Sequence, residues 1–270
     1  MGEPYAPDPQ ITVDGIRIDL RRKGSGRPLL FLQGLEGWIR DDRYFDLLAR
    51  DFDVLAPAHP GFGQSELPRE FATVGDLALF YLTFLEELGL NDVVLVGSSF
   101  GGWVAAELAV RSTDRLAALV LVDSLGIKVG GREDRDITDI YALPQSEVAR
   151  LFYHDPEANR RDITRLPDHV LRLIARAREA MCMFGWKPYM HTPSLKRWLR
   201  RIGVPALVLW GESDGVVSTE YGRAFAGHIP GAAFRAIPQA GHYPHLEQPD
   251  AFASAVLEFV NGPSPMRRSA

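Results

Sequence analysis

Residues 93–108 read VVLVGSSFGGWVAAEL, and this stretch decides how the chain is expected to fold. Its first half is a short aliphatic run typical of a buried strand, and its second half has the pattern of a helix. Gly97 and Gly101 bracket Ser99, at the offsets where strand and helix approach closely. Ser98 lacks such small neighbours, so Ser99 is the serine that a sharp strand-to-helix turn would expose as a nucleophile.

Short aliphatic runs recur on both sides of this turn. PLLFLQG (28–34), DVLAPA (53–58), LAALVLVDS (116–124) and PALVLWG (205–211) are bounded by turn formers, as expected for parallel strands covered on both faces. AFRAIPQAG (233–241) is a weaker candidate strand, and ITVDGIRIDLRR (11–22) alternates around Asp14-Gly15, which favours an antiparallel hairpin.

Helical patterns fall between these runs, at residues 41–50, 73–90, 100–111, 218–228 and 250–260. Strands that alternate with helices predict an α/β fold with a doubly wound, mostly parallel sheet. Ligand sites in such a fold lie beyond the carboxyl ends of the strands.

One interval breaks the alternation. Residues 125–200 contain helical patterns and no convincing strand, and the interval is too long for an ordinary crossover. We interpret it as a helical lid inserted into a core domain made of residues 1–124 and 201–270.

Composition narrows the class of protein. The chain has 270 residues, a formal charge of −5 and one cysteine, Cys182. An acidic balance argues against nucleic-acid binding, and a lone cysteine cannot form an intrachain disulfide or a cysteine metal cluster. Neither an export signal nor a membrane span is recognisable, so we expect a cytoplasmic protein without membrane partners. A homodimer is the commonest assembly among soluble oligomers, and it is the oligomer we would expect if the chain self-associates.

A nucleophilic serine needs a base and an orienting acid. AGHYPHLEQP (240–249) follows the last candidate strand and offers His242 and His245, while Asp214 follows the strand 205–211. The order Ser99, Asp214, His242 matches a serine, acid, histidine arrangement. Asp123 ends an earlier strand and competes with Asp214 for the role of acid, although capping of the next turn is its simpler role.

At these motifs the sequence resembles the α/β-hydrolase fold family, over nearly the whole chain. The resemblance is carried by HPGFGQS (59–65), GSSFGG (97–102), GESD (211–214) and the G-H-x-x-x-x-E-x-P pattern at 241–249. It implies a nucleophile elbow at Ser99 and assigns His242, which follows glycine, as the catalytic histidine. His245 is then expected in a loop or pocket role.

The family also implies an oxyanion hole built from two backbone N–H groups, here those of Leu35 and Phe100. The chain departs from the family's usual His-Gly by having Gln33-Gly34. Because the donor is a backbone amide, the change need not abolish catalysis. We expect Gln33 to satisfy backbone groups beside the pocket or to alter the pocket's polarity.

The pocket itself is less well marked in the sequence. Trp186 and Tyr189 are candidates for its wall, with packing of the lid on the core as the commoner role for such aromatics. The lid arginines Arg172, Arg176 and Arg178 could bind a substrate carboxylate, although solvated helix faces explain most such residues.

The resulting hypothesis is a serine hydrolase that cleaves a small-molecule carboxylic ester or lactone through an acyl-enzyme at Ser99, without a metal or organic cofactor. The main alternative is a carbon–carbon hydrolase of meta-cleavage products, which are vinylogous diketo acids, and perhydrolysis is a third chemistry. An alternative from another class is a non-catalytic ligand-binding protein on the same fold.

Overall fold

The computed structural model describes residues 8–38, 43–131, 133–159 and 163–262 of the chain. Residues 1–7 lie outside this description, and most of the argument against an export signal rests on them. The first two residues of the helix expected at 41–50 also lie outside it.

A single sheet of eight strands organises the fold, in the order β1-β2-β4-β3-β5-β6-β7-β8. The strands are β1 (Gln10–Val13), β2 (Ile16–Gly24), β3 (Arg27–Leu32), β4 (Phe52–Pro57), β5 (Val93–Ser98), β6 (Leu116–Val122), β7 (Ala206–Gly211) and β8 (Ala233–Ile237). β1 and β2 pair antiparallel, as does β2 with β4, and the remaining pairs are parallel. The predictions of an N-terminal hairpin and of a mostly parallel sheet are confirmed.

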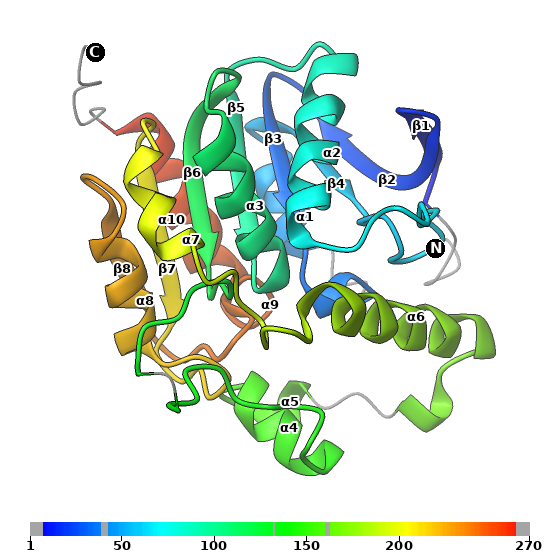
Figure 1. Cartoon of the computed structure of the whole chain (residues 1–270), viewed down its shortest axis with the longest axis vertical. Coiled ribbons are helices and arrows are strands. Elements are labelled where there is room, and N and C mark those ends of the chain that lie inside the picture. Colours follow the sequence, from blue (N-terminus) through cyan, green and yellow to red (C-terminus); the bar gives the residue numbers. More distant parts are fainter. Residues whose placement is uncertain (1–7, 39–42, 132, 160–162, 263–270) are drawn as a thin grey trace.

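Helices cover both faces of this sheet and the edge at its carboxyl ends. The helices of the chain are α1 (Arg43–Leu48), α2 (Val74–Glu87), α3 (Phe100–Arg111), α4 (Gln145–Phe152), α5 (Pro156–Asn159), α6 (Asp168–Gly185), α7 (Leu195–Trp198), α8 (Thr219–Gly227), α9 (Pro244–Glu247) and α10 (Pro249–Asn261), with 3-10 turns η1 (Leu35–Trp38), η2 (Ile163–Arg165) and η3 (Leu199–Arg201). The apolar side chains of α2, α3 and α8 pack on one face, and those of α1 and α10 on the other (Figure 1). The fold is therefore the doubly wound α/β arrangement that the alternating pattern predicts.

The central strands are buried on both faces, which explains why their sequences do not alternate. Every residue of β5, β6 and β7 is buried. Their carboxyl ends all face the same edge of the sheet because the three strands run parallel. Side chains that follow these strands can therefore meet at one place.

The segment between β6 and β7 contains helices α4 to α7 and adds no strand to the sheet among its described residues. Figure 1 shows α4, α5 and α6 below the carboxyl ends of the strands. Arg176 of α6 attaches the segment to the core by donating to the carbonyl oxygens of Gly63 and Ser65. The division into a core and a lid domain at residues 125 and 200 stays a prediction.

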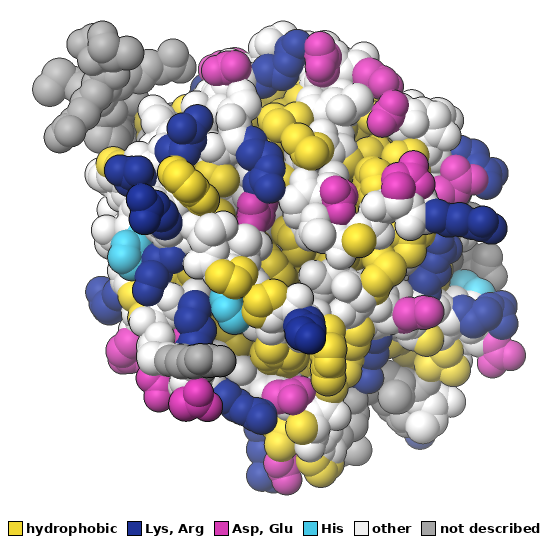
Figure 2. All heavy atoms as spheres, in the orientation of Figure 1, with side chains coloured by type: hydrophobic (Ala, Val, Ile, Leu, Met, Phe, Trp, Pro, Cys, Tyr) yellow, Lys and Arg dark blue, Asp and Glu magenta, His cyan; other side chains and the backbone are white. Residues whose placement is uncertain are grey.

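Acidic and basic side chains are interspersed over the face shown in Figure 2, so the net charge of −5 is not gathered there into one acidic patch. Among the described residues, no helix is both long and apolar enough to cross a lipid bilayer.

Candidate active site

The turn between β5 and α3 holds Ser99 in an unusual backbone conformation. Its φ is 52° and its ψ is −117°, a region that costs a non-glycine residue about 1–3 kcal/mol. The turn is tight because Gly97 lies against the backbone of α3, where a Cβ would be 2.5 Å from the carbonyl oxygen of Gly101. The neighbouring Ser98 ends β5 and is fully buried, with no hydrogen bond to its hydroxyl within the described structure. The local strain thus presents Ser99, and not Ser98, to the edge of the sheet.

We predict that Gly101→Ala destabilises the elbow. A Cβ at this position would stand 2.1 Å from the carbonyl oxygen of Leu32, and the strand backbone cannot move away cheaply. The free energy of unfolding should fall by about 1–3 kcal/mol or more, which urea denaturation would measure. Gly227→Ala, where a Cβ meets nothing within 4 Å, is the matched control. Equal stability of the two variants would contradict this account.

A chain of hydrogen bonds joins the three residues expected to act together. The Nε2 atom of His242 lies 2.8 Å from the Ser99 hydroxyl oxygen, and its Nδ1 atom lies 2.8 Å from Oδ2 of Asp214. This hydrogen-bonded chain is shielded from water, since His242 is 1% exposed and Ser99 is 5% exposed. The geometry suits proton transfer from the hydroxyl to an imidazole whose tautomer is set by the carboxylate.

The loops that carry the acid and the base are locked against each other. A Cβ on Gly211 would stand 1.9 Å from the carbonyl oxygen of Gly241, so the end of β7 is in backbone contact with the loop that follows β8. Glu247 accepts from the Gly241 N–H at 2.6 Å, which fixes the loop immediately before His242. The same carboxylate accepts from the N–H groups of His154 and Asp155. The glutamate of the G-H-x-x-x-x-E pattern therefore links the histidine loop to the helical segment between β6 and β7.

Leu35 and Phe100, expected to form the oxyanion hole, are the first residues of η1 and α3. The first N–H groups of a helix have no partner within it, so these two positions suit the oxyanion role, which stays a prediction. The two segments meet at Gly34, where a Cβ would contact the Ser99 Cβ at 2.8 Å and its hydroxyl at 3.3 Å.

Gln33 ties this loop to α1 and to the segment that follows β4. The side-chain amide of Gln33 donates to the Tyr44 hydroxyl at 3.1 Å. The backbone carbonyl oxygen of Gln33 accepts from Nε2 of His59 at 2.8 Å. Burial lowers the pKa of His59 to about 4, so the ring is neutral and its Nδ1 accepts from the Tyr81 hydroxyl. Gln33 lines a hollow that does not include Ser99.

A narrow cavity lies beside Ser99 and His242. Its described lining is mostly apolar and includes Leu35, Ile140, Phe152, Met181, Met190 and Val216. Thr138, Tyr189 and Tyr243 add the other polar groups, and no described lining residue carries a formal charge unless His242 is protonated. Trp186 and Tyr189 line a neighbouring hollow, and of these two only Tyr189 also reaches the cavity.

Sequence reasoning missed Glu36, which lies under the oxyanion loop. It is 3% exposed, accepts from the Gly34 N–H at 2.9 Å, and lies 3.5 Å from Nε2 of the fully buried His245. Burial alone would raise the pKa of Glu36, but His245 and the Gly34 N–H outweigh it and lower that pKa below its usual value. The available signal was a charged residue inside the glycine-rich stretch 33–37.

We predict that Glu36→Gln weakens the fold at neutral pH by about 1–3 kcal/mol, because it removes the charge that faces His245. Since the folded pKa lies below the ordinary 4.5, the ionised carboxylate stabilises the fold above that pH, and its contribution disappears as pH falls through the folded pKa. Urea denaturation at pH 7 and near pH 4 would measure both effects. Glu70→Gln, at an exposed position, is the control. If the difference in free energy of unfolding between wild type and Glu36→Gln is larger near pH 4 than at pH 7, the assignment is refuted.

Asp123, Asp214 and His242 also come within 4.8 Å of one another, a spacing that a metal ion could bridge. The hydrogen bonds of His242 and Asp214 already occupy the nitrogen and oxygen atoms that an ion would need. The cluster thus fits an acid and base arrangement better than a metal site.

A doubly wound sheet with a strained serine elbow, an adjacent histidine and a buried acid defines the class of α/β enzymes that use a serine nucleophile. The sequence profile of the alpha/beta hydrolase family matches residues 29–255. The chain therefore belongs to the alpha/beta hydrolase family.

Individual relatives differ in their named activities. The chain is 30% identical to a dihydrolipoyllysine-residue acetyltransferase component of the acetoin cleaving system from Cupriavidus necator, over 93% of this chain and 68% of that protein. It is 28% identical to a 2-hydroxymuconate semialdehyde hydrolase from a Pseudomonas species, over 93% of both.

Two solved structures illustrate the shared fold. A meta-cleavage product hydrolase from Pseudomonas fluorescens superposes with a TM-score of 0.76 at 20% identity, covering 94% of this chain and 98% of that one. An esterase from a Rhodococcus species superposes with a TM-score of 0.73 at 22% identity, covering 94% and 98%. The same fold thus accompanies both ester and carbon–carbon hydrolase names.

Proposed function

We propose that the protein hydrolyses a small, neutral carboxylic ester or lactone through an acyl-enzyme at Ser99. The observation that carries the proposal is the continuous hydrogen-bonded chain from Ser99 through His242 to Asp214, beside an apolar cavity.

The chemistry follows from the geometry. His242 Nε2 takes the hydroxyl proton as Ser99 Oγ attacks the carbonyl carbon, and the carbonyl oxygen becomes an oxyanion held by the N–H groups of Leu35 and Phe100. Collapse of the tetrahedral intermediate expels the alcohol, which receives the proton from His242. Water then attacks the acyl-enzyme with His242 again as base, and the acid is released.

The cavity favours a neutral substrate. Placing a carboxylate among the apolar groups that line it would cost free energy unless a cation paired with it. Arg176 is engaged with carbonyl oxygens of the core, and neither Arg172 nor Arg178 lines the cavity. The lid arginines are therefore poorly placed for the carboxylate-binding role that the sequence allowed them.

Carbon–carbon hydrolysis is the second candidate, because relatives named as hydrolases of 2-hydroxymuconate semialdehyde and of 2-hydroxy-6-oxo-6-phenylhexa-2,4-dienoate match most of the chain. Such substrates would require a cation at the cavity, and none of the described lining residues supplies one.

A substrate panel tests the choice. We expect kcat/KM for p-nitrophenyl butyrate to exceed that for the anionic p-nitrophenyl hemisuccinate by about 100-fold or more, the cost of burying an unpaired polar group. A vinylogous diketo acid should be cleaved more slowly than the neutral ester. Preferential cleavage of the diketo acid would overturn the proposal in favour of the carbon–carbon hydrolase.

A further inference from the structure

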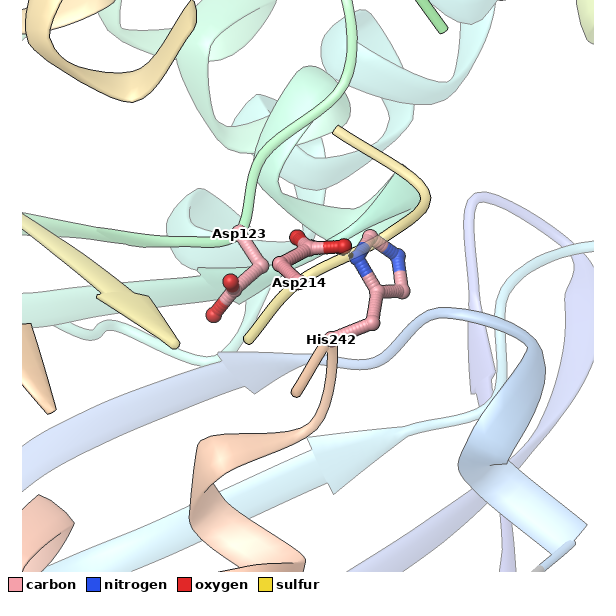
Figure 3. Close-up of side chains that lie close together, drawn as sticks. All are labelled: Asp123, Asp214 and His242. Atoms are coloured by element: carbon pink, nitrogen blue, oxygen red, sulfur yellow. Dashed lines mark hydrogen bonds and ion pairs between the residues drawn. The ribbon is translucent and has the colours of Figure 1, made fainter. Parts of the chain in front are cut away.

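A third buried acid, Asp123, lies behind the catalytic pair. It follows the last residue of β6 and is fully shielded from solvent. Figure 3 shows it with Asp214 and His242, each from the segment that follows a different strand, and an oxygen or nitrogen of each lies within 4.8 Å of the others. Asp123 takes no part in the proton transfers between Ser99, His242 and the substrate.

The hydrogen bonds of the two carboxyl groups are unequal. Asp214 Oδ1 accepts from the N–H groups of Val216 and Val217 at 2.7 and 3.1 Å, and its Oδ2 faces His242. Asp123 Oδ1 accepts one N–H, from Gly211 at 2.9 Å, and its Oδ2 has no donor within the described structure. A negative charge is therefore well supported on Asp214 and poorly supported on Asp123.

Two carboxylates this close in a buried site cannot both ionise without a large cost. Burial, followed by the charge of Asp214 and hydrogen bonding to it, raises the pKa of Asp123 well above its usual value. Glu247, the other acid that acts on Asp123, adds to the increase, and its own carboxylate is held by backbone N–H groups. The proton thus belongs on Asp123.

We infer that Asp123 is a positioning residue that stays protonated at neutral pH and donates its carboxyl hydrogen to Asp214. The bond would hold the ionised Asp214 against His242 Nδ1 and would satisfy the buried Oδ2 atom that otherwise lacks a partner. This inference rests on the proposed function only for its effect on turnover.

Infrared spectroscopy tests the proton without any substrate. We expect wild-type protein at pH 7 to show the carbonyl band of a buried protonated carboxylic acid, shifted by exchange into heavy water, and Asp123→Asn to lack it. If the Asp123→Asn spectrum keeps every protonated-acid band of the wild-type spectrum, the inference is overturned, whether or not the protein hydrolyses esters.

Isosteric substitution tests the positioning. In Asp123→Asn the amide oxygen can still accept from Gly211 and the NH₂ group can donate to Asp214, so the variant mimics the protonated acid. We expect kcat within about three-fold of wild type and an unchanged acidic limb of the pH profile, because no charge is removed. An acidic limb displaced to lower pH would mean that Asp123 is ionised, and would refute the inference.

Removing the donor should have the opposite result. Asp123→Ala deletes a hydrogen bond to a charged group, and we expect kcat to fall about ten-fold or more with little change in KM. Activity near wild type in the alanine variant would contradict the positioning role. If that variant does not fold, the asparagine variant and the infrared band still decide the question.

Discussion

Replacing Ser99 by alanine is expected to abolish turnover, with kcat lower by about a million-fold, as when the nucleophile of other serine hydrolases is removed. Among the described residues, the hydroxyl that hydrogen-bonds to His242 Nε2 is that of Ser99, at 2.8 Å. Steady-state hydrolysis of p-nitrophenyl butyrate would measure the loss. Intact-mass analysis after treatment with a fluorophosphonate should show one adduct in wild type and none in the variant.

Ser98→Ala is the matched control. This serine is adjacent in the chain, but its buried hydroxyl has no hydrogen bond within the described structure, so the variant should keep its adduct and most of its activity. Absence of the adduct in folded wild-type protein would favour a non-catalytic ligand-binding protein on the same fold. Labelling that survives in Ser99→Ala would place the nucleophile elsewhere.

Asp214→Asn should lower kcat by about 10⁴-fold, the loss expected when the orienting acid of such a triad becomes an amide. The reason is visible in the hydrogen bonds. Asp214 Oδ1 accepts from the N–H groups of Val216 and Val217, so the amide oxygen would occupy that place and the NH₂ group would face His242. The imidazole would then accept at Nδ1 and carry its proton on Nε2, where it cannot receive the Ser99 proton.

Single-turnover hydrolysis measures this loss, and thermal denaturation checks that the variant is folded. Asp123→Asn, the same chemical change on the neighbouring buried acid, is the control expected to remain active. Comparable loss in both variants would mean that the two carboxyl groups share the orienting role. Retention of more than a tenth of wild-type activity in Asp214→Asn would refute the assignment of the acid.

The sheet was largely predictable because burial on both faces leaves a plain trace in the sequence. The continuous aliphatic runs at β5, β6 and β7 correspond to strands in which every residue is buried. The elbow at Ser99 was also predictable, since a close approach of strand and helix requires glycine at Gly97 and Gly101. Such local constraints involve residues a few positions apart.

The partners of the buried acids were not predictable in this way. Glu36 and His245 are far apart in the sequence, and their 3.5 Å contact depends on how η1 and α9 pack. The sequence shows Glu36 inside a glycine-rich stretch, but it does not show that the carboxylate turns inward under Gly34. The support that Glu247 gives to Gly241, His154 and Asp155 likewise depends on two loops that meet only in the folded chain.

By itself the sequence determined the strand and helix order, the elbow, and the set of residues from which the site could be built, because each of these depends on local pattern and on glycine. Only the tertiary structure decided which of two acids faces the histidine. Ser99 and His242 are 143 positions apart, and their 2.8 Å contact exists because parallel strands end at one edge of the sheet. The tertiary structure also decided that the cavity is apolar and uncharged, because this depends on which side chains of the segment between β6 and β7 lie beside Ser99.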